Sequence, residues 1–332
     1  MPEIDPVAIA GPRPFWSVMI PCFNSAGLLA RTLESVLAQD PGPDVMQIEV
    51  VDDASTLDDP AAVVEGLAGS RVGYFRQPRN VGASANFTTC VRRSKGQWVH
   101  VLHSDDMVMP RYYERYRQQI EACPAARMVA AQTITTDAAE RYLGVTQPVE
   151  TDDGYMRDAA FVIATTNPLR CVSVVIARAA YETAGGFHPG LAHANDWEMW
   201  TRIASLERVA WVDEPFGLYR SHPDSDTNRL HRSTGYIDDC LVATEAIAGH
   251  FDDPEQRRHA RVAARRSVSD YAVGVGLGLV YEGWFRLGVS NAVHAVRIDP
   301  SVHTLTRAVE VAHLAAVRRL GPRFALPGLR RR

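Results

Sequence analysis

Two adjacent carboxylates, Asp105 and Asp106, follow an apolar run whose pattern predicts a buried strand. Neighbouring anions repel each other unless a cation offsets their charge. Carboxylate oxygens suit Mg²⁺ or Mn²⁺, and substrate phosphates usually complete the coordination of such ions. A role as a helix cap fits less well, because residues 107–110 do not begin a clean helical pattern. The pair therefore predicts a divalent-cation site that takes Mn²⁺ or Mg²⁺.

Polar side chains also stand at the ends of the other predicted strands in the first half of the chain. Taken alone, Asp52 and Asp53 equally fit a turn or a helix cap, and Asn80–Gly82 fits a turn. In an open parallel α/β sheet, however, ligands bind beyond the carboxyl ends of the strands, so these groups are expected to converge on one site. They lie at Pro21–Asn24, Asp52–Asp53, Arg79–Gly82 and His103–Asp106.

The sequence has no glycine-rich phosphate loop of either common kind, neither G-x-x-x-x-G-K nor G-x-G-x-x-G. A diphosphate at this site would therefore be held largely through the metal. This points away from dehydrogenases and from P-loop enzymes.

The elements that must position these side chains alternate regularly. Near-continuous apolar strands followed by amphipathic helices predict an α/β fold with a parallel sheet that helices cover on both faces. The predicted strands are 16–23, 46–53, 71–77 and 97–103, and the predicted helices are 25–39, 58–69 and 81–96.

The pattern changes along the chain and divides it into three parts. We expect an N-terminal extension at 1–14, an α/β domain at 15–228 and a helical C-terminal region at 229–332. The C-terminal helices and the arginine-rich chain end admit packing onto the α/β domain, homodimer formation or contact with an anionic membrane surface, and a solvated chain end is the plainer interpretation. The arginines of the chain end are Arg318, Arg319, Arg323 and Arg330–Arg332.

Composition narrows the class of protein. The chain has 332 residues and a formal net charge of -4, so no general attraction to nucleic acid is expected. Its five cysteines are widely spaced without a C-x-x-C pair, which argues against a disulfide framework and fits a reducing compartment. The N-terminus lacks the pattern of a signal peptide, and no run approaches the ~18 apolar residues of a spanning helix. We therefore expect a cytoplasmic protein, with peripheral contact at the inner face of the membrane left open.

Taken in order, the motifs resemble those of family 2 glycosyltransferases with the GT-A fold. This resemblance implies an α/β fold with a Rossmann-like, mixed but mostly parallel sheet flanked by helices, followed by a helical C-terminal region. The resemblance covers roughly Phe15 to Ser225 and rests on several stretches with the right order and spacing. They are SVMIPCFNSAGLLARTLESVLAQ, IEVVDDAS, NVGASANF, LHSDD, GGFHP, NDWEMWTRI and YRSHPDS. The resemblance implies metal-dependent, inverting transfer of a sugar from a nucleotide-diphosphate sugar to a hydroxyl of a glycan, lipid-linked or small-molecule acceptor.

The resemblance also implies which residues hold the sugar nucleotide. Phe23 would pack on the base, in a pocket that Pro21 and Asn24 shape, while Asp53 would accept a hydrogen bond from the base. Asp52 is expected near the ribose, and Asn80 beside the base or ribose. In the acidic motif, Asp105 would face the ribose or sugar, next to Ser104, where the family more often has another acid. Asp106 is expected to bind the metal, with His222 as a further ligand or, equally, an ordinary loop histidine.

The family's catalytic base lies in a Glu-Asp pair at the start of a helix, and here that pair reads Asn195-Asp196. The resemblance implies that Asp196 takes the proton from the acceptor hydroxyl. Asp196 also suits the N-terminal end of a helix on electrostatic grounds, and the two roles can coexist. His193 and Trp197 are candidates for contact with the acceptor, although Trp197 equally fits a core position.

Two other functions remain open from the sequence alone. The Asn195 substitution admits a sugar-nucleotide or glycan-binding protein that has lost catalysis. A nucleotidyltransferase on a related α/β fold is the less favoured alternative, because the segment after the first strand lacks the glycine-rich basic loop that such enzymes carry.

Overall fold

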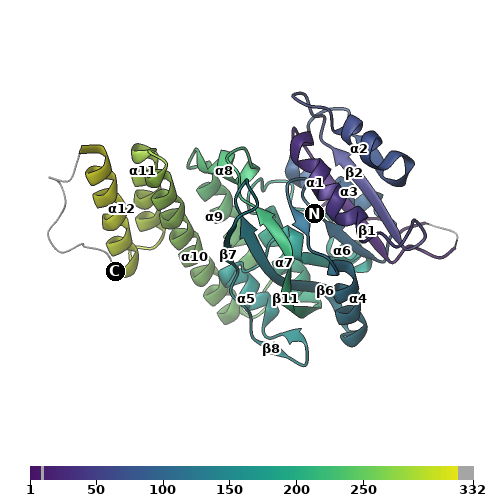
Figure 1. Cartoon of the computed structure of the whole chain (residues 1–332). Helices are drawn as coiled ribbons and strands as arrows, with labels where there is room; N and C mark the ends of the chain where they lie inside the picture. The colour runs from purple at the N-terminus through teal and green to yellow at the C-terminus, as the bar shows by residue number, and fades with distance from the viewer. Residues whose placement is uncertain (9–10, 321–332) are drawn as a thin grey trace. The chain divides into compact units, whose positions relative to one another are not determined.

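The computed structural model describes residues 1–8 and 11–320, which form two units (Figure 1). One unit takes in residues 1–163 and 167–222, and the other takes in 164–166 and the chain from Pro223 onward. The first unit contains the sheet, and the second is helical.

The first half of the sheet is parallel, as the alternating pattern predicts. Its strands lie in the order β3-β2-β1-β4, and every neighbouring pair runs in the same direction. All residues of β1 are buried, which explains its continuous apolar character. The strands are β1 (Trp16–Cys22), β2 (Met46–Asp52), β3 (Gly73–Arg76) and β4 (Trp98–Val101), and the helices that follow the first three are α1 (Ala26–Leu37), α2 (Pro60–Ala68) and α3 (Ala83–Arg93).

The second half of the sheet makes it mixed. Strand β10 (Val174–Ala177) runs antiparallel to both β4 and β6 (Ala126–Thr136), and β11 (Arg208–Arg220) then lies parallel to β6. Short strands border this part: β5 (Met107–Val108), β7 (Tyr142–Val145), β8 (Thr151–Asp152) and β9 (Tyr155–Met156). The remaining helices here are α4 (Tyr112–Ala122), α5 (Ala159–Thr166), α6 (Arg178–Ala184) and α7 (Asn195–Leu206), with short 3₁₀ turns at Gly69–Arg71 and Cys171–Ser173.

The predicted fold class is confirmed: a mixed, mostly parallel sheet flanked by helices, followed by C-terminal helices. Helix α1 shows how the sequence produces this packing. Leu29, Leu33 and Val36 recur at helical spacing and are fully buried in the core that includes β1 and β2. The opposite face of α1 carries Arg31 and Glu34, which are exposed and form an ion pair.

The described residues of the N-terminal segment pack onto the first unit. The carbonyl of Pro2 accepts a hydrogen bond from the Gly186 N–H at 2.8 Å, and Ile4 is buried. The carbonyl of Asp5 accepts a hydrogen bond from the Arg178 guanidinium at 2.9 Å. The start of the chain therefore forms part of the folded unit.

The second unit consists of consecutive helices. They are α8 (Asp226–His231), α9 (Gly235–Ala248), α10 (Pro254–Tyr281), α11 (Phe285–Ile298) and α12 (Val302–Leu320). Helix α10 begins with Pro254 after Asp253, whose carboxylate accepts hydrogen bonds from the next free backbone N–H groups. None of the helices in the described ranges is both long enough and apolar enough to cross a membrane. Of the basic residues at the chain end, Arg323 and Arg330–Arg332 lie outside the described residues.

Candidate functional site

The carboxyl ends of β1 and β2 are tied together by hydrogen bonds. Phe23, just after β1, is 41% exposed, so its ring is available to a ligand, whereas Pro21 is buried within the strand. Asn24 adopts a left-handed backbone conformation with φ of 50°. Its side-chain carbonyl accepts hydrogen bonds from the N–H groups of Thr56 and Leu57 at 2.8 and 3.0 Å. Asn24 therefore shapes the loop after β2.

Asp52 is fully buried and its carboxylate is occupied by protein donors. It accepts hydrogen bonds from the Tyr74 hydroxyl at 2.8 Å and from the Arg76 guanidinium at 2.6 Å. The backbone N–H and the hydroxyl of Ser55 complete this set. The predicted contact of Asp52 with a ribose has no support in this geometry, because the carboxylate has no exposed surface.

Asp53 holds the loop that follows β3. Its two carboxylate oxygens accept hydrogen bonds from the backbone N–H groups of Val81 and Gly82, at 2.7 and 2.9 Å. The Asn80 side chain donates to the Asp53 carbonyl at 3.2 Å. The structure therefore brings Asp53 and Asn80 together as predicted from the strand order, in a loop next to Phe23 and Asn24 along the same sheet edge.

Asp105 and Asp106 lie in the loop between β4 and β5 and differ in their surroundings. The Asp105 carboxylate lies 3.0 Å from His222 Nε2. Burial alone would raise the pKa of Asp105, but the hydrogen bond and charge of His222 hold it below its usual value. Ser104 is buried, and its hydroxyl is 2.6 Å from that of Ser25.

Asp106 is almost completely buried, with 1% of its surface exposed. Its Oδ1 accepts a hydrogen bond from the Arg220 backbone N–H at 3.0 Å, whereas its Oδ2 is buried and has no hydrogen-bond partner among the described residues. Burial and the neighbouring charge of Asp105 raise the pKa of Asp106 well above its usual value. A bound cation would reverse both effects.

His103 completes this cluster. Its ring stacks on Phe87 with 5.0 Å between centroids, and its Nε2 is a second buried atom for which the described residues supply no hydrogen-bond partner. Ligand atoms of His103, Asp105 and Asp106 lie within 4.8 Å of one another. Two carboxylates, an imidazole and unpartnered buried acceptors fit a divalent cation such as Mn²⁺.

Asp196 lies in the first turn of α7. Its Oδ1 accepts a hydrogen bond from the Trp197 N–H at 2.6 Å, and its Oδ2 lies 3.8 Å from the Cys171 thiol. Burial raises the pKa of Asp196, while the charges of His193, His103 and Arg170 oppose that rise. A carboxyl with a raised pKa suits proton transfer near neutral pH better than an ordinary one.

The residues on either side of Asp196 anchor the start of α7. Asn195 is buried and donates a hydrogen bond to Ser84 Oγ at 2.8 Å. Trp197 is 4% exposed, and its indole N–H donates to the Ile163 carbonyl at 2.7 Å. This geometry makes Trp197 a packing residue and gives no support to its predicted contact with an acceptor. His193 is partly exposed and lies close enough to Asp196 to influence it electrostatically.

Sequence reasoning did not include Arg170 and Arg220 in the site, and it left the role of His103 unassigned. Arg170 influences both Asp106 and Asp196 electrostatically, which places a positive charge near both acids. Arg220 borders Asp106 directly. The position of Arg220 in the YRSHP motif was a usable signal, but nothing in the sequence around Arg170 distinguishes it from a surface arginine.

Known proteins resemble this chain in sequence. Residues 17–172 match the model of the family described as Glycosyl transferase family 2. An uncharacterized glycosyltransferase of Haemophilus influenzae is 25% identical over 246 residues, which cover 71% of this chain and 80% of the relative.

Solved structures of low sequence identity share the fold. Staphylococcus aureus TarS 1–349, in complex with UDP-GlcNAc, superimposes with a TM-score of 0.63 at 17% identity, covering 92% of this chain and 91% of that one. The chain spans 55% of the longer TarS chain. The mannosyltransferase PcManGT from Pyrobaculum calidifontis, in complex with GDP-Man and Mn²⁺, gives a TM-score of 0.53 at 19% identity, covering 95% and 90% of the two chains.

The fold and the matches together define a glycosyltransferase of the GT-A type. The family 2 match covers residues 17–172, slightly less than half of the chain, and the fold of the first unit is the one that GT-A glycosyltransferases have.

Proposed function

We propose that this enzyme transfers a sugar from a nucleoside-diphosphate sugar to a hydroxyl group of a glycan, lipid-linked or small-molecule acceptor, with inversion at the anomeric carbon. The observation that carries the proposal is the buried, unpartnered Asp106 Oδ2 beside His103 and Asp105. The nucleotide-sugar complexes of the TarS and PcManGT structures support the class of sugar donor.

In this proposal the residues of the sheet edge bind the nucleotide. The exposed ring of Phe23 stacks on the base, and Pro21 and Asn24 set the shape of the pocket. Asp53 is buried and fixes the neighbouring loop with both carboxylate oxygens, whereas Asn80 in that loop is exposed and offers the base a polar contact. Asp52 acts indirectly, because its buried carboxylate holds Arg76 and the loop after β2 in place.

The acidic cluster would hold the divalent cation that offsets the charge of the diphosphate. Asp106 holds the divalent cation, Mn²⁺ or Mg²⁺, with His103 and Asp105 beside it. When bound, the ion offsets the negative charge that develops on the departing nucleoside diphosphate. In this structure His222 contacts Asp105, so its predicted role as a metal ligand stays a prediction, and orienting Asp105 is the role that its contact supports. Ser104 and Asp105 face the ribose or the transferred sugar.

Asp196 is the general base of the proposed reaction. Its carboxylate takes the proton of the acceptor hydroxyl as that oxygen forms a bond to the anomeric carbon, while the bond from that carbon to the diphosphate oxygen breaks. The positive charge of Arg170 near Asp196 and Asp106 favours the ionised form of both acids. His193 lies on the acceptor side of Asp196 in this arrangement.

The test incubates the purified chain with Mn²⁺ and a panel of UDP- and GDP-sugars, and measures release of nucleoside diphosphate by mass spectrometry. Turnover with one sugar nucleotide, lost in Asp196→Asn while binding of that nucleotide persists, is the expected result. Binding without hydrolysis or transfer under any condition would instead favour the non-catalytic binding protein that Asn195 suggested.

We propose that residues 15–228 form the catalytic domain and that the helical region at 229–332 contributes the contacts with an acceptor-bearing surface or a second copy of the chain. The basic residues Arg318 and Arg319 at the end of α12 support electrostatic attraction to an anionic membrane. A version of the chain that ends at Val317 tests this, because unchanged partitioning into the membrane fraction would exclude the basic end as an anchor.

A further inference from the structure

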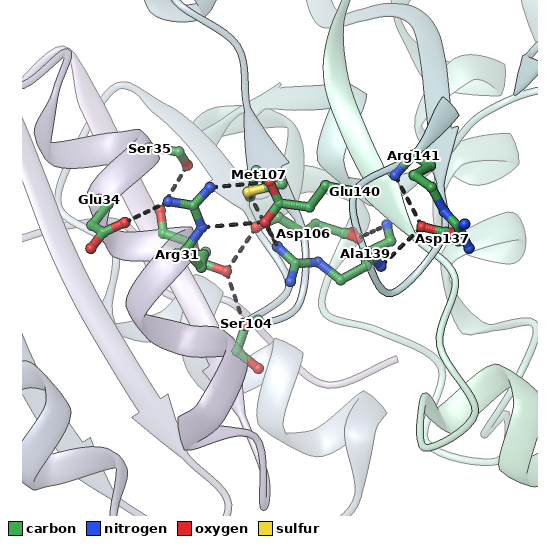
Figure 2. Close-up of polar contacts among 12 residues, drawn as sticks. Arg31, Glu34, Ser35, Ser104, Asp106, Met107, Asp137, Ala139, Glu140 and Arg141 are labelled. Carbon is green, nitrogen blue, oxygen red and sulfur yellow. Dashed lines mark hydrogen bonds and ion pairs between the residues drawn. The ribbon is translucent and has the colours of Figure 1, made fainter. Parts of the chain in front are cut away.

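A network of ion pairs lies beside Asp106, one of the three residues of the cluster formed by His103, Asp105 and Asp106. The network joins α1 to the turn between β6 and β7 (Figure 2). Glu140, in that turn, accepts hydrogen bonds from two atoms of the Arg31 guanidinium, at 3.2 and 3.1 Å. The same carboxylate lies 3.3 Å from the guanidinium of Arg220, at the end of β11. Glu140 therefore bridges an exposed cation on α1 and a buried cation next to the cluster.

The turn is built to present Glu140 in this position. Glu140 has a left-handed backbone conformation with φ of 63°, which non-glycine residues adopt only when the surroundings favour it. Asp137 supplies that support, since its carboxylate accepts hydrogen bonds from the backbone N–H groups of Ala139 and Arg141 and from the Arg141 side chain, at 2.9, 3.0 and 2.7 Å (Figure 2).

Arg220 needs a counter-ion, because its side chain is only 4% exposed. Its Nη2 contacts Glu140 and the Met107 sulfur, and its Nε is buried without a hydrogen-bond partner among the described residues. Asp106 also interacts with the charge of Arg220. Asp106 Oδ1 already accepts a hydrogen bond from the Arg220 backbone N–H. The Asp106 carboxylate therefore lies next to the backbone from which the Arg220 side chain extends.

We propose that Glu140 is a positioning residue that holds the Arg220 guanidinium away from Asp106, and so leaves Asp106 Oδ2 open to a divalent cation. Without Glu140, the buried guanidinium has Asp106 as a neighbouring counter-ion and would compete with the metal for the same oxygen. The inference rests on the proposed function of Asp106 as the metal ligand.

Helix α1 supports the same geometry through a second contact. The buried hydroxyl of Thr32 lies 2.9 and 2.7 Å from the carbonyls of Ser104 and Asp106, which fixes the backbone of the acidic loop. Because Arg31 and Thr32 are adjacent residues, α1 contacts both the acidic loop, through Thr32, and Glu140, through Arg31. The backbone contact does not depend on Glu140, so a change at Glu140 should alter the charges around Asp106 more than the course of the loop.

The experiment measures Mn²⁺ binding to the full chain without sugar nucleotide, from the electron paramagnetic resonance signal of free Mn²⁺. Glu140→Gln should weaken Mn²⁺ binding roughly 10–100-fold, the usual cost of losing a partner in the outer shell of a metal site. Arg31→Gln is the matched control: it removes the exposed half of the bridge and should change the affinity by less than about twofold. Asp106→Ala should remove specific Mn²⁺ binding.

A double-mutant cycle separates the proposed role from a merely structural one. In an Arg220→Met background no guanidinium remains to compete, so adding Glu140→Gln should have no further effect on Mn²⁺ affinity. Arg220→Met alone should retain Mn²⁺ binding, which tests the inference even if E140Q fails to fold.

Three outcomes overturn the inference. Equal Mn²⁺ affinity of E140Q and the wild type, with binding abolished in D106A, would overturn the role of Glu140 and leave the proposed function intact. An equal loss in the Arg220→Met background, or loss of binding in Arg220→Met itself, would do the same. Absence of Mn²⁺ binding to the wild type would instead overturn the proposed metal site, and this inference with it.

Discussion

Two pairs of adjacent aspartates follow parallel strands on the same edge of the sheet, and the protein treats them differently. Asp52 and Asp53, after β2, accept hydrogen bonds from protein donors that hold two loops in place. Asp105 and Asp106, after β4, share a cluster in which Asp106 keeps one buried oxygen without a hydrogen-bond partner among the described residues. The dipeptide is the same in both places, so the surrounding donors decide which pair is structural and which is open to a ligand.

Substitution of Asp196 has the largest expected effect. It tests whether the site that contains Asp105 and Asp106 is catalytic. Asp196→Asn keeps the size of the side chain but removes the group that accepts a proton, so kcat should fall by roughly 100–10,000-fold. Sugar-nucleotide binding, measured by calorimetry, should be retained. Normal turnover would remove Asp196 as the base.

Asp52→Ala tests the structural half of the comparison. The change leaves the Tyr74 hydroxyl and the partly exposed Arg76 guanidinium without their shared acceptor, and the free energy of unfolding should fall by about 1–3 kcal/mol. Chemical denaturation followed by circular dichroism measures this. Asp44→Ala is the control, because Asp44 is exposed and its loss should change stability by less than about 0.5 kcal/mol. Equal stability of the two variants would contradict a structural role for Asp52.

Asp106→Asn should have the opposite effect on stability in the absence of metal. Removing the buried charge relieves the repulsion from Asp105, and the variant should gain about 1–2 kcal/mol while it loses Mn²⁺ binding. Thermal melting with and without Mn²⁺ measures both changes. A destabilised, metal-free D106N protein would show that the ionised carboxylate serves the fold, as that of Asp52 does.

The pH dependence of stability is a smaller effect that tests whether Asp106, unlike Asp52, is buried without compensation for its charge. The pKa of Asp106 is raised in the folded protein, so the folded state binds this proton more tightly than the unfolded state does. Its contribution to stability is therefore present below the ordinary pKa of an aspartate and is lost as the pH rises through the raised value. Metal-free wild type should lose this contribution on going toward neutral pH, whereas D106N should not. Parallel pH profiles for the two proteins would contradict the raised pKa.

Most of the fold could be predicted from the sequence because its signals are local. The apolar strands and the helical spacing of residues such as Leu29 and Leu33 identify the parallel half of the sheet, and a stripe of apolar residues identifies the C-terminal helices. The antiparallel placement of β10 between β4 and β6 was not predictable in this way, because direction within a sheet depends on distant partners rather than on local pattern.

The candidate site was predictable only in outline. Strand order places Phe23, Asp53 and Asp106 on one edge, but exposure separates residues that look equivalent in the sequence. Asp52 and Trp197 were predicted to contact ligands, and the structure buries both and supplies their hydrogen-bond partners. Arg170 could not be predicted as a site residue, because only folding brings its charge near Asp106 and Asp196.

The hydrogen bond that ties Asn195 to Ser84 has a consequence for the departure from the family's Glu-Asp pair. The Leu191 carbonyl can only accept, so the Ser84 hydroxyl turns its proton toward Leu191 and presents lone pairs to residue 195. That polarity requires a donor at position 195, which the amide of asparagine provides and an ionised glutamate does not. The hydrogen bonds around position 195 therefore favour asparagine over glutamate. The presence of asparagine beside Asp196 does not by itself imply that catalysis has been lost.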